Sequence, residues 1–351
     1  MNAVTTSSVG ATNRHSAGSL RRRNSRTAAL TCGLGLLALA LAAMSLLIGP
    51  SGLSAKEILR GLFSGHGTAS VIAQQIRLPR AVLALFVGGA LGASGAALQG
   101  LFRNPLAEPG VTGVTSAAGL GAVVAFYFGF AAAHAVLLPA FAILGALASA
   151  FILYLLSRAG AGAVALVLGG VAISSLATAL TALALSLSPN PYAMSEIVMW
   201  MMGSLKDRTL SDVMFAAPLV ALGIVVLLTT ARGLDALILG EEAAHTLGIN
   251  VHGIRRRVVL GVALATGAAT AAAGAVSFVG LVVPHLLRPF YGYEPARLIW
   301  PSALGAAALV TAADIAVRLI SPDEKLPLGV LTAILGAPFF IWLILRMRRD
   351  A

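Results

Sequence analysis

The sequence has little charge and almost no cysteine. Asp, Glu, Lys and Arg make up 11% of its 351 residues, against about a quarter in a soluble domain. The single cysteine, Cys32, excludes a disulfide within the chain and a metal site built from cysteines. The three lysines, Lys56, Lys206 and Lys325, lie outside any glycine-rich phosphate-binding loop. We therefore expect neither an ATPase of the phosphate-loop type nor another enzyme, since paired catalytic carboxylates and histidines at metal-ligand spacing are also missing.

Long apolar runs fill most of the chain, and hydrophobic residues make up 58% of it. A bilayer core needs about 20 apolar residues per helix. The runs are continuous, so the sequence predicts an all-α integral membrane protein with about ten transmembrane helices. The predicted spans are 28–49, 81–101, 114–131, 136–156, 164–186, 211–231, 258–275, 276–290, 299–319 and 327–345. We expect residues 1–27 to form a polar cytoplasmic tail and 28–346 to form one transmembrane domain. Its first span, about 20 residues long, is long for a signal peptide, so we expect it to be retained.

Two shorter segments differ from these spans. Residues 54–63 begin with a serine suited to cap a helix and are typical of an amphipathic surface helix. Residues 195–204 are apolar but too short to cross a bilayer, so they predict a re-entrant or interfacial helix.

The basic residues predict the orientation, because cytoplasmic loops carry an excess of Lys and Arg. With both termini in the cytoplasm, sixteen of the 24 Lys and Arg residues lie inside. Three arginines, Arg77, Arg80 and Arg318, then lie on the outer side against the rule. These three need another explanation.

Glycines recur inside the spans. Gly88 and Gly92 are four residues apart, a spacing that lets helices approach closely. A faint inverted internal repeat relates Gly95 and Pro105 to Gly274 and Pro284, which are separated by the same ten residues. Inverted repeats are frequent in transporters.

Asp314 is an acid well inside an apolar span, with Arg318 four residues later on the same helical face. A structural ion pair or interhelical hydrogen bond is one interpretation. A proton-relay carboxylate is the other.

The longest inside loop, 232–257, has helical spacing. Glu241 and Glu242 stand near the start of the predicted helix, where acids suit the helix dipole, and Gly248 is placed to end it. The segment is either a docking helix on the cytoplasmic face or a loop lying on the headgroups.

Five ordered motifs resemble the permease subunits of ABC importers for iron siderophores, haem and vitamin B12. They are RLPR (77–80), RNPLAEPGVTGV (103–114), GEEAAHTLGIN (240–250), GAVSFVGLVVPHLLRP (274–289) and LPLGVLTAILGAPFFIWL (326–343). The resemblance implies a type II ABC importer permease fold in the bacterial inner membrane, a dimer of two permease copies, two separate ATPase subunits and a periplasmic binding protein. The net charge of +11 is explained by basic residues in cytoplasmic loops, so we expect no nucleic-acid partner.

The resemblance also implies roles for particular residues. An ATPase-coupling helix corresponds to Gly240, Glu241, Ala244, Leu247 and Gly248, with Glu241, Ala244 and Leu247 as its contact face. Docking of the binding protein corresponds to Arg77, Arg80 and Arg318. The cytoplasmic gate corresponds to Asn104 and Leu106. The segment 159–166, AGAGAVAL, departs from the vitamin B12 permease, which has hydroxyl residues at that gate position.

The prediction of the cargo rests on two segments of the sequence. Residues 187–209 and 281–295 resemble the haem-importing branch, and Met199, Trp200 and Met202 supply an adaptable apolar wall for a flat macrocycle. We therefore expect haem as the transported substrate, with no permanently bound cofactor and no metal ligand in the chain. Ferric siderophore and cobalamin are the alternatives within the family. Outside it, an ion-coupled secondary transporter would use Asp314 as its coupling site.

Overall fold

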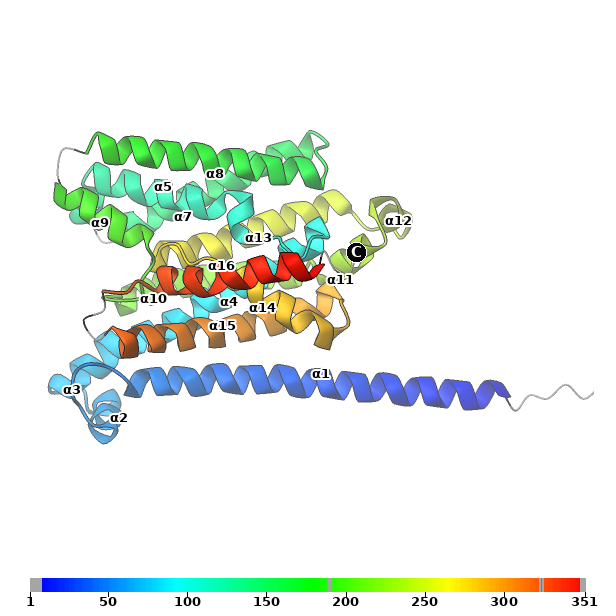
Figure 1. Cartoon of the computed structure of the whole chain (residues 1–351), viewed down its shortest axis with the longest axis horizontal. Helices are drawn as coiled ribbons and strands as arrows, with labels where there is room; N and C mark the ends of the chain where they lie inside the picture. Colours follow the sequence, from blue (N-terminus) through cyan, green and yellow to red (C-terminus); the bar gives the residue numbers. More distant parts are fainter. Residues whose placement is uncertain (1–7, 135, 189–190, 322, 324, 348–351) are drawn as a thin grey trace, which may run out of the picture.

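The computed structural model describes residues 8–134, 136–188, 191–321, 323 and 325–347. These residues form helices joined by loops, without a β-strand among them. Most of the long helices run roughly side by side in an elongated bundle (Figure 1). This arrangement agrees with the all-α membrane fold that the apolar runs predict.

Ten main helices correspond one to one with the ten predicted spans. They are α1 (Ser8–Leu47), α4 (Leu78–Phe102), α5 (Val114–Tyr127), α7 (Leu137–Arg158), α8 (Ala163–Ser186), α10 (Leu210–Leu228), α13 (Val251–Ala273), α14 (Val279–Leu287), α15 (Pro295–Ile320) and α16 (Leu328–Met347). Seven helical stretches are long and apolar enough to cross a membrane within the described residues. The nine-residue α14 is too short to cross by itself.

Shorter helices connect the long ones. They are α2 (Ala55–Ser64), α3 (Thr68–Val71), the π-helical η1 (Ile72–Arg77), η2 (Pro109–Thr112), α6 (Phe130–Ala133), α9 (Pro191–Met201), α11 (Ala231–Ile238), α12 (Glu241–Thr246) and η3 (Arg288–Tyr291). Both predicted short segments contain helices, α2 and α9, and α9 begins and ends earlier than the predicted 195–204.

The two ends of the bundle carry different elements. Helices α2, α3 and α9 lie at one end, here the α2 end, and α12 lies at the opposite end, the α12 end (Figure 1). The amino-terminal part of α1 and the carboxyl end of α16 point toward the α12 end. The described chain therefore starts and finishes at the same end of the bundle.

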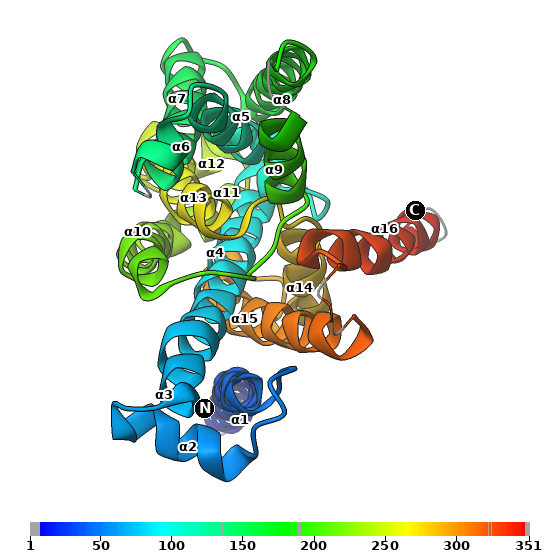
Figure 2. The same ribbon diagram turned by 90° about the vertical axis from the view of Figure 1, so that its left-hand side faces the viewer.

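Helix α4 forms the centre of the bundle and is buried along nearly its whole length (Figure 2). Its glycines allow this position. A Cβ on Gly92 would lie 2.1 Å from the carbonyl oxygen of Ser302 in α15, and one on Gly95 would lie 1.8 Å from that of Gly280 in α14. The close packing that the small-residue spacing predicts is confirmed.

Some helix ends differ from the predicted ones. Helix α1 begins at Ser8, so the helix of the first span extends back into the segment predicted as a polar tail. Helix α13 begins at Val251 rather than 258, because the Asn250 side chain accepts a hydrogen bond from the Gly253 amide at 2.8 Å and caps it. Local capping thus extends this helix beyond its apolar run.

Candidate functional site

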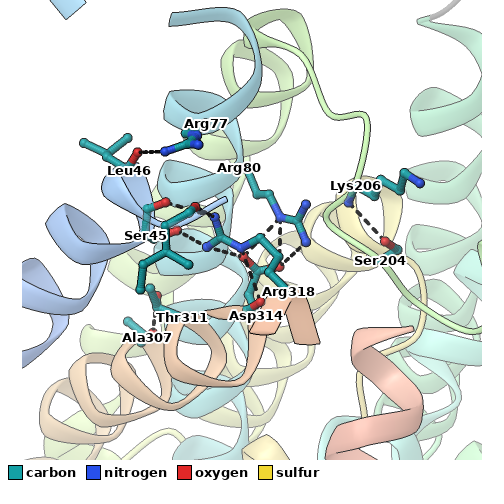
Figure 3. Close-up of polar contacts among 11 residues, drawn as sticks. Ser45, Leu46, Arg77, Arg80, Ser204, Lys206, Ala307, Thr311, Asp314 and Arg318 are labelled. Atoms are coloured by element: carbon teal, nitrogen blue, oxygen red, sulfur yellow. Dashed lines mark hydrogen bonds and ion pairs between the residues drawn. The ribbon is translucent and has the colours of Figure 1, made fainter. Parts of the chain in front are cut away.

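Three arginines and one aspartate form a buried cluster at the α2 end (Figure 3). Arg77 ends η1 and Arg80 lies in the first turn of α4, whereas Asp314 and Arg318 lie near the end of α15. Arg77, Arg80 and Arg318 are only 4%, 6% and 5% exposed, and Asp314 only 1%.

Asp314 pairs with two arginines at once. Arg80 Nε donates to Asp314 Oδ1 and Oδ2 at 3.0 and 3.1 Å, and Arg80 Nη2 lies 3.0 Å from Oδ1. Arg318 Nη2 lies 3.0 Å from Oδ2. The ion-pair interpretation of Asp314 and Arg318 is confirmed, and Arg80 joins α4 to the same carboxylate. A charge-assisted, bidentate contact of this kind is among the stronger polar contacts in proteins.

Two arginines of the cluster, Arg77 and Arg318, cap the carboxyl end of α1. Arg77 Nη1 donates to the carbonyls of Leu46 and Leu47 at 2.9 and 2.7 Å. Arg318 Nη1 donates to those of Ser45 and Ile48 at 2.9 and 2.7 Å. The last carbonyls of a helix lack partners within it, so the guanidinium groups satisfy them and fix α1 to α4 and α15.

These contacts explain three positive charges that the distribution of basic residues leaves unexplained. Each guanidinium is held inside the chain by a carboxylate or by helix carbonyls. Docking of a binding protein by Arg77, Arg80 and Arg318 is a separate prediction, which these contacts do not test.

The α12 end carries the predicted coupling helix. Helix α12 begins after Gly240, whose φ of 104° suits glycine, and the chain leaves it through Gly248 at φ 76°. Glu241 forms an ion pair with Arg255 of α13. Ala244 is fully buried, whereas Leu247 is 62% exposed. Of the predicted contact face, Leu247 therefore points outward and Ala244 packs against the body of the protein.

Two further apolar side chains accompany Leu247 at this end. Ile238, the last residue of α11, and Leu239, in the turn that follows, are largely exposed. The exposed apolar surface thus extends to the residues just before the predicted coupling helix.

The predicted gate residues lie in the loop after α4. Asn104 Oδ1 accepts a hydrogen bond from the Leu106 amide at 2.9 Å, which closes a tight turn. Asn104 also lines a cavity of about 220 Å³ that reaches Ile238 of α11. Gln99 and Arg288, which are hydrogen-bonded to each other, line the same cavity.

Glu108 has a structural role that the sequence did not reveal. Its Oε2 accepts a hydrogen bond from the Phe278 amide at 3.2 Å, directly before α14. Phe278 has the left-handed φ of 66°, uncommon for a bulky residue. Glu108 therefore ties the loop after α4 to the start of the short helix α14. The sequence feature that could have pointed to this role is that Glu108 lies inside the 103–114 motif.

The predicted pathway residues, Met199 and Trp200 on α9 and Met202 just after it, differ in exposure. Met199 and Met202 are exposed, and Trp200 is buried. Helix α9 lies beside α5 and α8 at the α2 end (Figure 2). Among the described residues, no group of three or more His, Cys, Asp or Glu side chains is arranged to hold a metal ion.

Comparison with known proteins decides the family. The model of the FecCD transport family matches residues 36–346. The chain belongs to the FecCD transport family. The hemin transport system permease protein HmuU of Yersinia pestis is 41% identical over 281 residues, 78% of this chain and 83% of HmuU. The Fe(3+) dicitrate transport system permease protein FecD of Escherichia coli is 41% identical over 293 residues, 84% of this chain and 91% of FecD.

A third relative and a solved structure extend the comparison. The cobalamin import system permease protein BtuC of Halobacterium salinarum is 40% identical over 279 residues, 79% of this chain and 74% of BtuC. A structure described as an inward-facing conformation of a metal-chelate type ABC transporter superposes with a TM-score of 0.80. It is 32% identical and covers 91% of this chain and 99% of its own.

This FecCD protein is thus an ABC importer permease, a membrane-spanning transport component and not an enzyme. Its family places it in the inner membrane, with an ATPase and a binding protein as working partners. Relatives for hemin, ferric dicitrate and cobalamin are almost equally similar, so overall identity does not separate the three cargoes.

Proposed function

We propose that this permease moves haem from a periplasmic binding protein into the cytoplasm, driven by ATP hydrolysis on a separate subunit. The observation that carries the proposal is the run 187–209, which resembles the haem-importing branch. Within that run, Met199 on α9 and Met202 just after it are exposed, and α9 lies at the α2 end. Flexible, polarisable methionines suit contact with a flat macrocycle. Residues 189 and 190 of the run lie outside the described residues.

The cargo is tested with the assembled complex in proteoliposomes. Binding protein loaded with haem, ferric dicitrate or cobalamin is added outside, and ATP turnover and cargo uptake are measured. We expect haem to raise both rates above those of the other two cargoes. Stimulation by ferric dicitrate or cobalamin alone would assign the permease to that cargo and overturn the proposal.

The assembly that this function requires has two permease copies, two ATPase subunits and one binding protein. In it, both termini and α12 face the cytoplasm, and Asn104 and Leu106 form the inner gate. The amino-terminal part of α1 and the carboxyl end of α16 point toward the α12 end, which supports this orientation, as does the excess of basic residues in the loops assigned to the inside. Haem is cargo in this scheme rather than a resident cofactor.

We also propose that carboxylates of the binding protein approach the arginine cluster from outside. Arg77→Gln is the clearest probe, because Arg77 donates to carbonyls and to the Ser51 hydroxyl rather than to Asp314. We expect weaker association with the binding protein, and a larger loss at low ionic strength, where charges are less screened.

The same variant separates docking from a purely structural role. Thermal unfolding of Arg77→Gln is recorded beside its affinity for the binding protein. An unchanged affinity together with a lowered unfolding temperature would limit Arg77 to holding α1 and would refute docking by this residue.

A further inference from the structure

Helix α2 is fixed to the protein by one face. Ile58 is fully buried, and Gly61 rests on α3 so closely that a Cβ there would lie 2.5 Å from the Ala69 carbonyl oxygen. Gln74 Nε2 donates to the carbonyls of Gly61 and Leu62 at 3.1 and 3.0 Å. These contacts determine which side of α2 faces away from the bundle.

The opposite face of α2 combines positive charge with exposed apolar surface. Leu59 and Arg60 lie three and four residues after Lys56, and Phe63 lies four and three residues after them, so the four side chains share one side of the helix. Lys56 and Arg60 are exposed, Leu59 is 50% exposed and Phe63 is 89% exposed. Together with Ser64 they line one shallow surface hollow. These four residues are called the basic-apolar face below.

The acidic side chain of α2, Glu57, is hydrogen-bonded at the amino-terminal cap of the helix. Glu57 Oε2 accepts hydrogen bonds from the Ser54 amide and hydroxyl at 2.8 and 2.7 Å. The Ser54 hydrogen bonds, followed by the attraction of Arg60, lower the pKa of the Glu57 carboxyl. The ionised carboxylate is therefore engaged at the cap, and the basic-apolar face keeps its two cations.

The position of α2 places this face where an apolar helix surface gives way to solvent. The apolar stretch of α1 ends at Leu47, and α2 begins eight residues later at Ala55. Seen from the α2 end, α2 lies at the edge of the bundle, outside α1 and α3, rather than over its centre (Figure 2). A peripheral helix at the end of a membrane span lies at the level of the lipid headgroups.

We propose that the basic-apolar face binds anionic phospholipid headgroups. Phe63 and Leu59 enter the boundary between headgroups and acyl chains, and Lys56 and Arg60 contact the phosphates. Interfacial helices bury their apolar side about 5–10 Å into this boundary, and basic side chains add attraction to anionic lipid. The peripheral position of α2 favours lipid over a protein partner that docks above the centre. The inference does not depend on the cargo.

The insertion of Phe63 can be measured directly because the chain has one cysteine. In a Cys32→Ser background, Phe63→Cys and Leu59→Cys are labelled with an environment-sensitive fluorophore, with exposed His66→Cys beyond the helix end as control. The proteins are placed in nanodiscs with lipids spin-labelled at acyl carbon 5 or 12. We expect quenching at 63 and 59 to exceed that at 66, and carbon 5 to quench more than carbon 12.

The role of the cations is tested by Lys56→Gln with Arg60→Gln. In nanodiscs with phosphatidylglycerol and phosphatidylcholine, we expect each lost cation to lower the preference for the anionic lipid about fivefold. Water-like emission at both 63 and 59, equal to that at 66, would overturn the proposal. So would shielding of these positions that appears only when a periplasmic binding protein is added, since that outcome identifies a protein partner.

Discussion

At the scale of single residues, the arginine cluster shows how a membrane protein accommodates buried charge. Removing a guanidinium group from water is costly unless a carboxylate and further acceptors compensate it. Asp314 supplies the carboxylate to Arg80 and Arg318, and the end of α1 supplies carbonyls to Arg318 and Arg77. The charges and the open helix end therefore stabilise each other.

Replacing Asp314 with Asn tests this interdependence. Two buried guanidinium groups would lose their shared carboxylate, so we expect the free energy of unfolding to fall by about 3–5 kcal/mol. Thermal unfolding of the purified permease in detergent measures the change. Asp323→Asn is the matched control, because Asp323 and its partner Lys325 are highly exposed and such pairs contribute about 1 kcal/mol or less. Equal unfolding temperatures for the two variants would contradict the interpretation.

The sequence revealed part of this cluster. Asp314 and Arg318 are four residues apart, so helical geometry alone predicts their contact. Arg80 is 234 residues from Asp314, and its pairing depends on how α4 packs against α15. For the same reason the inward direction of Ala244 escaped prediction, because the spacing within α12 does not indicate which neighbour covers it.

At the scale of elements, the position of α4 depends on close contact between helix backbones. Association of helices in lipid depends on van der Waals packing, which requires small residues where two axes approach. Gly88 and Gly92 face backbone carbonyls of α15, and Gly95 faces α14. Added side-chain volume at these points must separate the helices.

Gly92→Ala tests the packing. The new methyl group would lie 2.1 Å from the Ser302 carbonyl oxygen, so we expect overpacking to lower the free energy of unfolding by about 1–3 kcal/mol. In Gly33→Ala, on α1, the added Cβ has no atom within 4 Å. We expect this control to unfold at or above the temperature of the unmodified protein. Similar losses in both variants would refute close packing as the cause.

The number of helices was predictable because each long helix contains a continuous apolar run. The residues at which the helices begin and end were harder to predict. The start of α13 depends on the Asn250 cap, and the short α14 starts where the Glu108 carboxylate binds the Phe278 amide. The first is a local side-chain cap, the second joins residues 170 positions apart, and the apolar pattern encodes neither.

The α12 element carries a prediction for the proposed coupling to the ATPase. Leu247→Asp places a charge on an exposed apolar position, so we expect at least about tenfold weaker binding of the ATPase subunit. Association is measured between the purified permease and ATPase. Leu210→Asp, half exposed at the start of α10, changes the same residue type on another helix end and is expected to bind normally. Equal affinity for both variants would exclude Leu247 from the contact.

At the scale of the whole molecule, the proposed contact site for the ATPase lies at the α12 end and the arginine cluster at the α2 end. An ATP-driven importer requires ATP hydrolysis, whereas an ion-coupled transporter requires an ion gradient. In proteoliposomes containing the complete complex, we expect cargo uptake to need ATP and to persist when a protonophore removes the proton gradient. Uptake that continues without the ATPase and stops with the protonophore would favour ion coupling through Asp314.

One continuous helical stretch, Thr68–Phe102, joins these two ends across 35 residues. At 1.5 Å per residue it is about 52 Å long. Arg77 and Arg80 are its tenth and thirteenth residues, on the α2 side of its midpoint, and the turn with Asn104 and Leu106 follows its other end. A tilt of about 5° around its midpoint would move each end by about 2 Å in opposite directions. A small push at the Thr68 end of this stretch would therefore shift the turn of Asn104 and Leu106, the proposed gate, in the opposite direction.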